Sequence, residues 1–200
     1  MKKSKIRVNR ALLVVDVQND FCPGGALAVP EADAVVPVLN QYIEAFQTHA
    51  QLICATRDWH PHTTTHFQES GGVWPRHCVQ GTAGAAFHPH LQLPHTALII
   101  SKGDQPDSDG YSAFAGHDPR GRTLREILQE ARIHELYVGG LATDYCVKAT
   151  VLDGLRDTIK VILLTDAVRG VELHPGDVRQ ARQEMIAAGA RECVFSQLQW

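Results

Sequence analysis

The stretch Gly139–Val147 places a cysteine, Cys146, where a short apolar run passes into a segment with helical spacing. At a helix N-terminus, free backbone N–H groups and the helix dipole favour a thiolate over a thiol. The glycines that open the stretch allow a sharp turn and a close approach of the backbone to a ligand. A cysteine without supporting residues is more often a small buried apolar side chain. Cys146 is therefore a candidate nucleophile only if other residues can activate it.

Two further reactive side chains, Asp16 and Lys102, follow the apolar runs 11–15 and 97–100, which have the composition of buried strands. In an open parallel sheet the carboxyl ends of the strands meet at one edge, where ligands bind. Asp16 could take the thiol proton there, and Lys102 could stabilise the thiolate and keep Asp16 ionised. Either residue alone would more often be structural, as a turn cap or a solvated charge. Their joint placement with Cys146 favours a nucleophilic site.

Histidine is the one unusual feature of the composition, because the chain has eleven and they crowd between residues 60 and 95. Asp58 and His60 offer a carboxylate oxygen and an imidazole nitrogen two residues apart, and His66 and His77 follow in the same region. One carboxylate with two or three imidazoles suits zinc, iron or manganese. The other histidines of this region are expected to be surface loop residues: His62, His88, His90 and His95.

Apolar runs and helical periodicities alternate along the chain. The patterns predict strands at residues 11–15, 52–56, 97–100, 136–138, 161–164 and 192–195, and helices at 33–48, 123–132, 143–155 and 174–188. Thr123 and Glu126 have the spacing of a capping box. The alternation predicts parallel pairing with helices on both faces. The expected fold is therefore α/β, with three αβα layers around a six-stranded, mainly parallel, Rossmann-like sheet. The irregular region 61–93 lies outside this pattern, and such segments are usually functional.

Length and composition are those of a globular protein, with 200 residues, 44% of them hydrophobic and 20% charged. We expect one domain, 1–200, in which residues 1–10 form a flexible arm. A net charge of −3 gives no reason to expect nucleic acid or a membrane surface as a partner. No apolar run is long enough for a signal peptide core or a membrane span. Five cysteines without a CxxC pair argue against a disulfide framework and fit a reducing cytoplasm.

Several motifs occur in an order that resembles one family of enzymes, and the resemblance extends from about Ala11 to Phe195. The motifs are Val14–Phe21, Asp58–His60, Trp74–Gly81, Lys102–Gly103 and Gly140–Val147. Together they resemble the nicotinamidases (pyrazinamidases) of the isochorismatase-like cysteine hydrolases. The resemblance implies the isochorismatase-like version of the αβα fold.

The resemblance also implies roles in catalysis for residues at the strand ends. Asp16, Lys102 and Cys146 correspond to the catalytic triad of the family. A cis peptide bond is implied between Leu141 and Ala142, so that the backbone N–H groups of Ala142 and Cys146 form an oxyanion hole.

The family's remaining site residues concern the metal and the substrate ring. The implied metal ligands are Asp58, His60 and His77, with His66 at a position that supplies a further ligand in some members. They would hold one divalent ion, expected to be zinc, with iron and manganese as alternatives. Phe21 and Trp74 correspond to ring-stacking aromatics, and Tyr111 is expected close to the same pocket. No role is assigned to Tyr145, and that of the acidic loop 104–109 stays open.

The function implied is hydrolysis of nicotinamide to nicotinate and ammonia through a thioester, as in NAD salvage, with activity extending to pyrazinamide. The expected partner is this small molecule, and a homo-oligomer is compatible with the sequence. Three alternatives remain: a related amidase for carbamoyl or maleamate-type substrates, a metallohydrolase in which Cys146 is structural, and a dinucleotide-binding domain. The last lacks support because residues 16–25 contain no GxGxxG motif.

Overall fold

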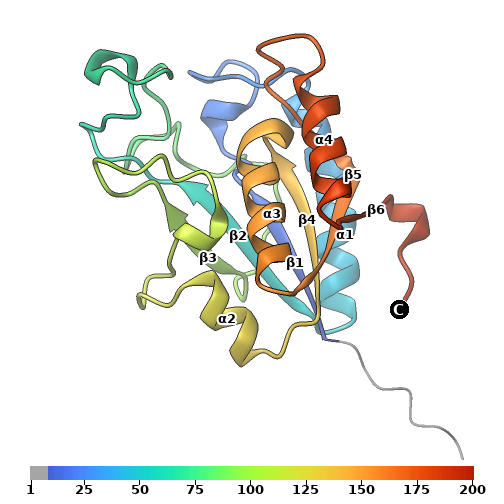
Figure 1. The fold of residues 1–200 in the computed structure, drawn as a ribbon. Helices are drawn as coiled ribbons and strands as arrows, with labels where there is room; N and C mark the ends of the chain where they lie inside the picture. The colour runs from blue at the N-terminus through green and yellow to red at the C-terminus, as the bar shows by residue number, and fades with distance from the viewer. Residues whose placement is uncertain (1–8) are drawn as a thin grey trace, which may run out of the picture.

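A computed structural model describes residues 9–200 of the chain and contains one six-stranded sheet with the strand order β3-β2-β1-β4-β5-β6 (Figure 1). The strands are β1 (Arg10–Val15), β2 (Leu52–Asp58), β3 (Leu98–Lys102), β4 (Glu135–Leu141), β5 (Lys160–Arg169) and β6 (Arg191–Cys193). The α-helices are α1 (Val35–Thr48), α2 (Leu124–Glu130), α3 (Lys148–Arg156) and α4 (Asp177–Ala187). Each pair of neighbouring strands is parallel. The predicted α/β fold with a six-stranded sheet is confirmed.

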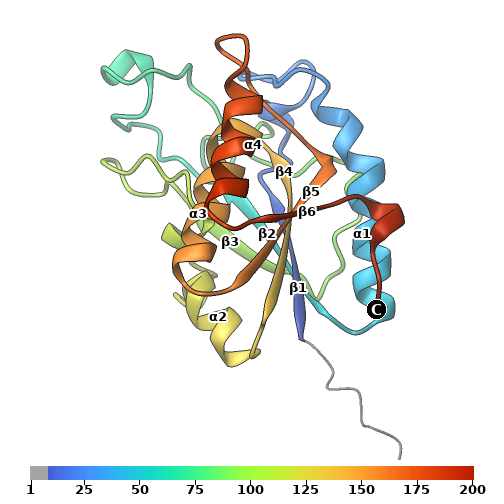
Figure 2. The ribbon, with the colours of Figure 1, turned by 45° about the vertical axis from the view of Figure 1, so that its right-hand side comes forward.

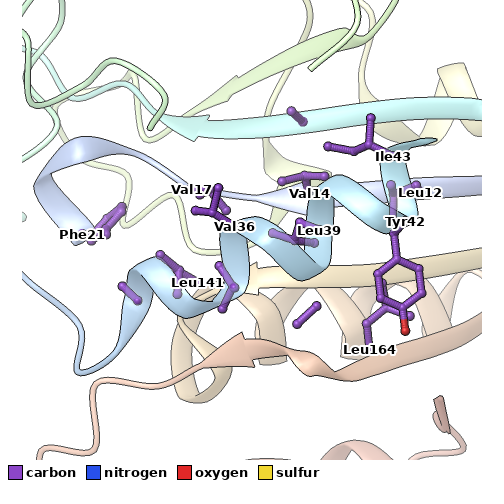
Figure 3. Close-up of a cluster of buried hydrophobic side chains, with 14 of the residues drawn as sticks. Leu12, Val14, Val17, Phe21, Val36, Leu39, Tyr42, Ile43, Leu141 and Leu164 are labelled. Atoms are coloured by element: carbon purple, nitrogen blue, oxygen red, sulfur yellow. The ribbon is translucent and has the colours of Figure 1, made fainter. Parts of the chain in front are cut away.

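Helices cover both faces of the sheet, with α1 on one side and α2, α3 and α4 on the other (Figure 2). Alternate residues of β1 pack into the two hydrophobic cores, one on each face of the sheet. Leu12 and Val14 pack in the cluster that contains α1 (Figure 3), while Leu13 and Val15 pack in the cluster that contains Ile127, Val151 and Met185. Because both faces of β1 are buried, its sequence is continuously apolar rather than alternating.

The direction in which the strands are added reverses beside β1. From β1 the chain adds β2 and then β3 on one side, and it then returns to add β4, β5 and β6 on the other. Such a reversal leaves a crevice at the carboxyl ends of β1 and β4, which is where open α/β sheets bind ligands. Asp16 directly follows β1, and β4 leads into the segment with Cys146.

Strands β2 and β3 are longer than predicted and include the reactive residues instead of ending before them. Asp58 and Lys102 are the last residues of β2 and β3 and are paired with each other across the ladder. Strand β5 also continues beyond the predicted end, and its second half pairs with the end of β4 through Gly140 and Val168. Apolar runs mark only the buried middle of a strand, so the polar ends were missed.

Helix starts show a second group of differences. The helix predicted at 143–155 opens with a π-helical turn, Thr143–Val147, before α3. The capping box of Thr123 and Glu126 is present at the start of α2, as predicted.

Of the predicted flexible arm, residues 1–8 lie outside the described part, and Arg10 already belongs to β1. No helix among the described residues is long and apolar enough to cross a membrane.

Gly140, near the end of β4, has a backbone conformation that leaves no room for a side chain beside β1. Its φ is +123°, and a Cβ built at this position would lie 2.1 Å from the backbone oxygen of Val15. The atoms that such a Cβ would meet are the backbone O, N and C of Val15 in the neighbouring strand β1. Strands β1 and β4 cannot move apart without opening the centre of the sheet. A side chain at position 140 is therefore excluded.

Replacing Gly140 with alanine is expected to lower the free energy of unfolding by about 3 kcal/mol or more, because the clash adds to an unfavourable φ. Gly121→Ala is the matched control, since Gly121 also has a positive φ of +80° but a Cβ at this position would have nothing within 4 Å. The free energy of unfolding of this control should fall by only about 1–2 kcal/mol. Chemical denaturation measures both, and equal losses would contradict the steric argument.

Candidate active site

Lys102 lies at the centre of a buried cluster at the carboxyl ends of the strands. Its Nζ lies 2.7 Å from Asp16 Oδ2 and 3.3 Å from Cys146 Sγ, and it donates a hydrogen bond to Asp58 Oδ1. All four side chains are buried. The three residues predicted from separate strand ends therefore meet, and the ammonium group also contacts a predicted metal ligand.

Backbone geometry fixes the acid and the thiol of this cluster. Asp16 has a φ of +49°, which turns the chain away from the sheet directly after β1, and its Oδ1 accepts a 2.6 Å hydrogen bond from the hydroxyl of Thr56. Cys146 lies in the π-helical turn, where the carbonyl of Ala142 accepts two backbone hydrogen bonds. The peptide bond between Leu141 and Ala142 is cis, as predicted.

Burial determines the protonation of the cluster. It raises the pKa of Cys146 well above the ordinary value, and the nearby Lys102 only partly offsets this. Burial also raises the pKa of Asp16 to about 6, against the opposing effect of Lys102. The pKa of Lys102 is itself raised, because two carboxylates outweigh the effect of its burial. The resting residue is therefore a thiol rather than the thiolate expected from its place at a helix start.

Three histidines converge beside this cluster. One ligand atom from each of His60, His66 and His77 lies within 4.8 Å of the others. The Nδ1 atoms of His60 and His77 lie 2.9 Å and 2.7 Å from the carbonyls of Gly103 and Pro75. These contacts assign the proton to Nδ1 and leave each Nε2 with a free lone pair. His60 Nε2 is buried and has no hydrogen-bond partner in the described part of the chain, so the set has the chemistry of a metal site.

Asp58 connects the histidines to the Lys102 cluster. Its Oδ2 lies 3.6 Å from His60 Nε2 and 3.9 Å from His77 Nε2, while its Oδ1 accepts from Lys102. Although burial opposes it, the charge of Lys102 holds the pKa of Asp58 below its ordinary value. Burial lowers the pKa of His66 to about 4 and also lowers that of His77, so both rings are neutral at pH 7. A carboxylate with neutral imidazoles fits a divalent ion such as zinc.

A second group with the composition of a metal site, two carboxylates and a thiol, is already neutralised by the ammonium group of Lys102. Single ligand atoms of Asp16, Asp58 and Cys146 lie within 4.8 Å of one another. The ammonium group of Lys102 contacts all three side chains. Among residues 9–200, the histidine group is paired only with carboxylates and with no Lys or Arg, so it is the better candidate for a metal.

A small cavity connects the two groups. Cys146 and Ala142 line it together with Asp58, His66 and His77. Four aromatic residues also line it: Phe21, Trp74, Tyr111 and Tyr145. The predicted nucleophile, most of the predicted metal ligands and the predicted ring-binding aromatics thus face one space.

The aromatic wall is held by contacts between loops. Trp74 Nε1 donates a 2.8 Å hydrogen bond to the hydroxyl of Tyr111, and the Trp74 and Tyr145 rings meet edge to face at 4.9 Å. Tyr145, Leu27 and Val171 line the cavity but were not predicted. For Tyr145, its position directly before the nucleophile was an available signal. Leu27 and Val171 had no such signal in the sequence, because they lie in connecting loops outside the motifs.

The acidic loop 104–109 packs beside the metal-type histidines. The carbonyl of Pro106 accepts hydrogen bonds from the hydroxyl and backbone N–H of neighbouring threonines, Thr64 Oγ1 at 2.9 Å and Thr65 N at 2.9 Å. Asp109 Oδ1 lies 3.7 Å from His66 Nδ1. The loop therefore supports the segment that carries His66. Of the histidines expected on the surface, His62, His90 and His95 are exposed, and His88 is half-buried.

The chain is thus a three-layer α/β protein with a buried Asp–Lys–Cys cluster at the point where the strand order reverses. An isochorismatase domain model matches residues 10–191. The nicotinamidase of Escherichia coli is 46% identical over 197 residues, covering 90% of this chain and 92% of the relative. The chain belongs to the isochorismatase family.

Solved structures of similar proteins support the same assignment. The pyrazinamidase of Pyrococcus horikoshii, in complex with zinc, is 47% identical with a TM-score of 0.86, and the match covers 94% of this chain and 99% of that one. PnC1 of L. infantum, in complex with nicotinate, is 32% identical with a TM-score of 0.82 and 96% coverage of both chains.

Replacing His60 with alanine is expected to weaken zinc binding by roughly 100-fold or more, because a buried lone pair is removed from the ligand set. His62→Ala is the matched control, since this exposed histidine belongs to the same loop region. Competition with a chromophoric chelator measures both affinities. If the two variants bind zinc equally well, the histidine group is not the metal site.

Proposed function

We propose that this protein is a metal-assisted cysteine amidohydrolase that converts nicotinamide to nicotinate and ammonia, and pyrazinamide to the corresponding acid. The observation that carries the proposal is the contact of Lys102 with both Asp16 and Cys146 beside a cavity with aromatic walls. The E. coli nicotinamidase, the zinc-bound pyrazinamidase and the nicotinate complex of similar proteins support the choice of substrate.

In this mechanism the aromatic walls bind the pyridine ring and orient its carboxamide. Phe21 and Trp74 would contact the two faces of the ring, and Tyr111 holds Trp74 in place through its hydroxyl. Asp58, His60, His66 and His77 would hold one divalent ion, proposed to be zinc. When bound, this ion supplies a Lewis-acid contact for the ring nitrogen. Such fixed docking contributes to rate by holding the amide carbon near the thiol of Cys146.

The first half-reaction forms a thioester and releases ammonia. Because the resting Cys146 is a thiol, its proton must leave as the sulfur attacks, and Asp16, which faces the thiol, accepts it. The S–C bond forms, and the carbonyl oxygen takes the negative charge. Asp16 then gives the proton to the amide nitrogen, the C–N bond breaks, and ammonia leaves.

The proposed oxyanion hole is formed by the backbone N–H groups of Ala142 and Cys146. Both residues line the cavity: Ala142 directly follows the cis peptide bond, and Cys146 lies in the π-helical turn that comes next. Fixed backbone dipoles aimed at a developing negative charge stabilise it without reorganisation. Lys102 would hold the carboxyl group of Asp16 close to the thiol throughout the cycle.

The second half-reaction reverses the proton movements with water as the nucleophile. Asp16 takes a proton from water, the hydroxide attacks the thioester carbon, and the S–C bond breaks. The thiolate of Cys146 recovers the proton from Asp16. The nicotinic acid formed by the attack gives its own proton to solvent and leaves as the carboxylate, nicotinate. A pKa of about 6 suits this residue for both directions of transfer near neutral pH.

Replacing Cys146 with alanine is expected to lower kcat for ammonia release from nicotinamide by a factor of roughly 10⁴ or more, because no thioester can form. Cys193→Ala is the control, since this cysteine is half-buried on β6, outside the cavity. Mass spectrometry of protein quenched during turnover should detect an acylated wild-type chain. Full activity in Cys146→Ala would favour a metallohydrolase instead.

A substrate comparison separates this proposal from the related amidases. Ammonia release is measured on nicotinamide, on pyrazinamide and on N-carbamoylsarcosine at equal concentrations. The aromatic walls predict turnover of the first two only. Preferential turnover of N-carbamoylsarcosine would assign the chain to another activity of the family.

The pH profile tests the role of Asp16. Its pKa is raised to about 6, so the carboxylate that must accept the thiol proton is lost as the pH falls through this value. We expect kcat/KM to fall about tenfold per pH unit below about pH 6. The hydroxyl of Thr56 lowers the pKa of Asp16, so Thr56→Val should move this acid limb to higher pH. If the acid limb of the kcat/KM profile is unchanged in Thr56→Val, a group other than Asp16 controls that limb.

A further inference from the structure

Gln18 is a fully buried polar residue in the loop after β1 that no step of the mechanism uses. Its side-chain amide makes three hydrogen bonds, all in the interior. Oε1 accepts from the backbone N–H of Asp58 at 2.8 Å, and Nε2 donates to the backbone carbonyl of Asp58 at 2.8 Å. Nε2 also donates to the carbonyl of Ala85 at 2.9 Å. One side chain thus binds both polar backbone groups of a proposed metal ligand.

The sheet leaves a gap that this amide fills. The ladder between β1 and β2 ends at the pair Val14 and Ala55, and the positive φ of Asp16 then turns the chain away from the sheet. Beyond that point Asp58 has no neighbouring strand on its β1 side. Buried backbone N–H and C=O groups need partners. The amide of Gln18 takes the place of the missing strand residue.

Asp58 has little freedom to move without losing its function. Its Oδ1 accepts from Lys102, and its Oδ2 lies 3.6 Å from His60 Nε2 and 3.9 Å from His77 Nε2. Metal ligands must be held within about 0.5 Å of the productive geometry. A backbone that lost its partners at Asp58 would move this carboxylate relative to the histidines.

Gln18 also connects this backbone to neighbouring parts of the site. Its bond to Ala85 reaches the loop that follows His77. Its own carbonyl accepts from the backbone N–H of Phe21 at 3.1 Å. The residue therefore fixes the carboxylate ligand relative to the loop after His77 and to the segment of Phe21, a residue that lines the cavity.

We propose that Gln18 is a positioning residue that holds Asp58 in the geometry required to bind the metal ion. The inference rests on the metal site of the proposed function. It concerns the affinity of the site for the ion, so it can be tested without measuring turnover.

The test compares zinc affinity in Gln18→Met, Gln18→Glu and the wild-type chain by competition with a chromophoric chelator. Gln18→Met keeps the length of the side chain and removes all three hydrogen bonds. Gln18→Glu keeps the acceptor for the N–H of Asp58 and removes the amide donors, so the comparison does not depend on folding of the methionine variant. Both should bind zinc about 10–100-fold more weakly, as expected when a residue that supports a ligand is lost.

Tyr42→Phe is the control for a general loss of stability. Tyr42 is fully buried and donates a 3.0 Å hydrogen bond to Asp166, away from the metal site. Loss of this hydrogen bond should lower the Tm of the metal-free protein and leave its zinc affinity unchanged.

Two results would overturn the inference, and they differ in what else they contradict. If wild type binds one equivalent of zinc and both Gln18 variants bind it with equal affinity, Gln18 does not position the ligand, and the metal site stands. If wild type binds no zinc, the metal site of the proposed function is wrong, and the role of Gln18 is overturned with it.

Discussion

The buried ammonium group of Lys102 is the contact on which the rest of the site depends. Two carboxylates and a thiol lie within reach of this one cation, away from water. Without it, Asp16 and Asp58 would be uncompensated buried charges, and breaking a buried ion pair costs about 3–5 kcal/mol. The same cation acts against burial on the pKa of both carboxylates and keeps that of Asp58 below its ordinary value. Stability and reactivity at this edge of the sheet therefore have a common origin.

The position of the cluster follows from the topology of the sheet. Reversal of strand order beside β1 brings the ends of β1 and β4 to one crevice, and the pairing of β2 with β3 places Asp58 beside Lys102. Four residues separated by up to 130 positions in the sequence thus become neighbours at the ends of parallel strands. The helices contribute the cores that hold the strands in register, and α3 adds the turn with Cys146 at its start.

Sequence patterns identified the reactive residues near the strand ends better than they identified the residues around them. Asp16 and Lys102 could be found because a polar residue close after an apolar run marks the edge of a parallel sheet, and Cys146 because it stands where such a run passes into a helical segment. The thiol state of Cys146 could not be predicted, since it depends on burial by the whole fold and on two carboxylates from other strands. The role of Gln18 was equally hidden, because its hydrogen bonds join segments 40 and 67 residues away. Leu27 and Val171 gave no local signal of their place in the cavity wall.

The cavity wall has an origin different from that of the charged cluster. Asp16, Asp58 and Lys102 belong to strands or follow them directly, whereas Leu27, Trp74 and Val171 come from connecting segments. Loops tolerate substitution better than the strands they connect. The two parts of the site can therefore diverge at different rates during evolution. Ring recognition can change through loop residues while the buried charges, which the fold itself requires, stay fixed.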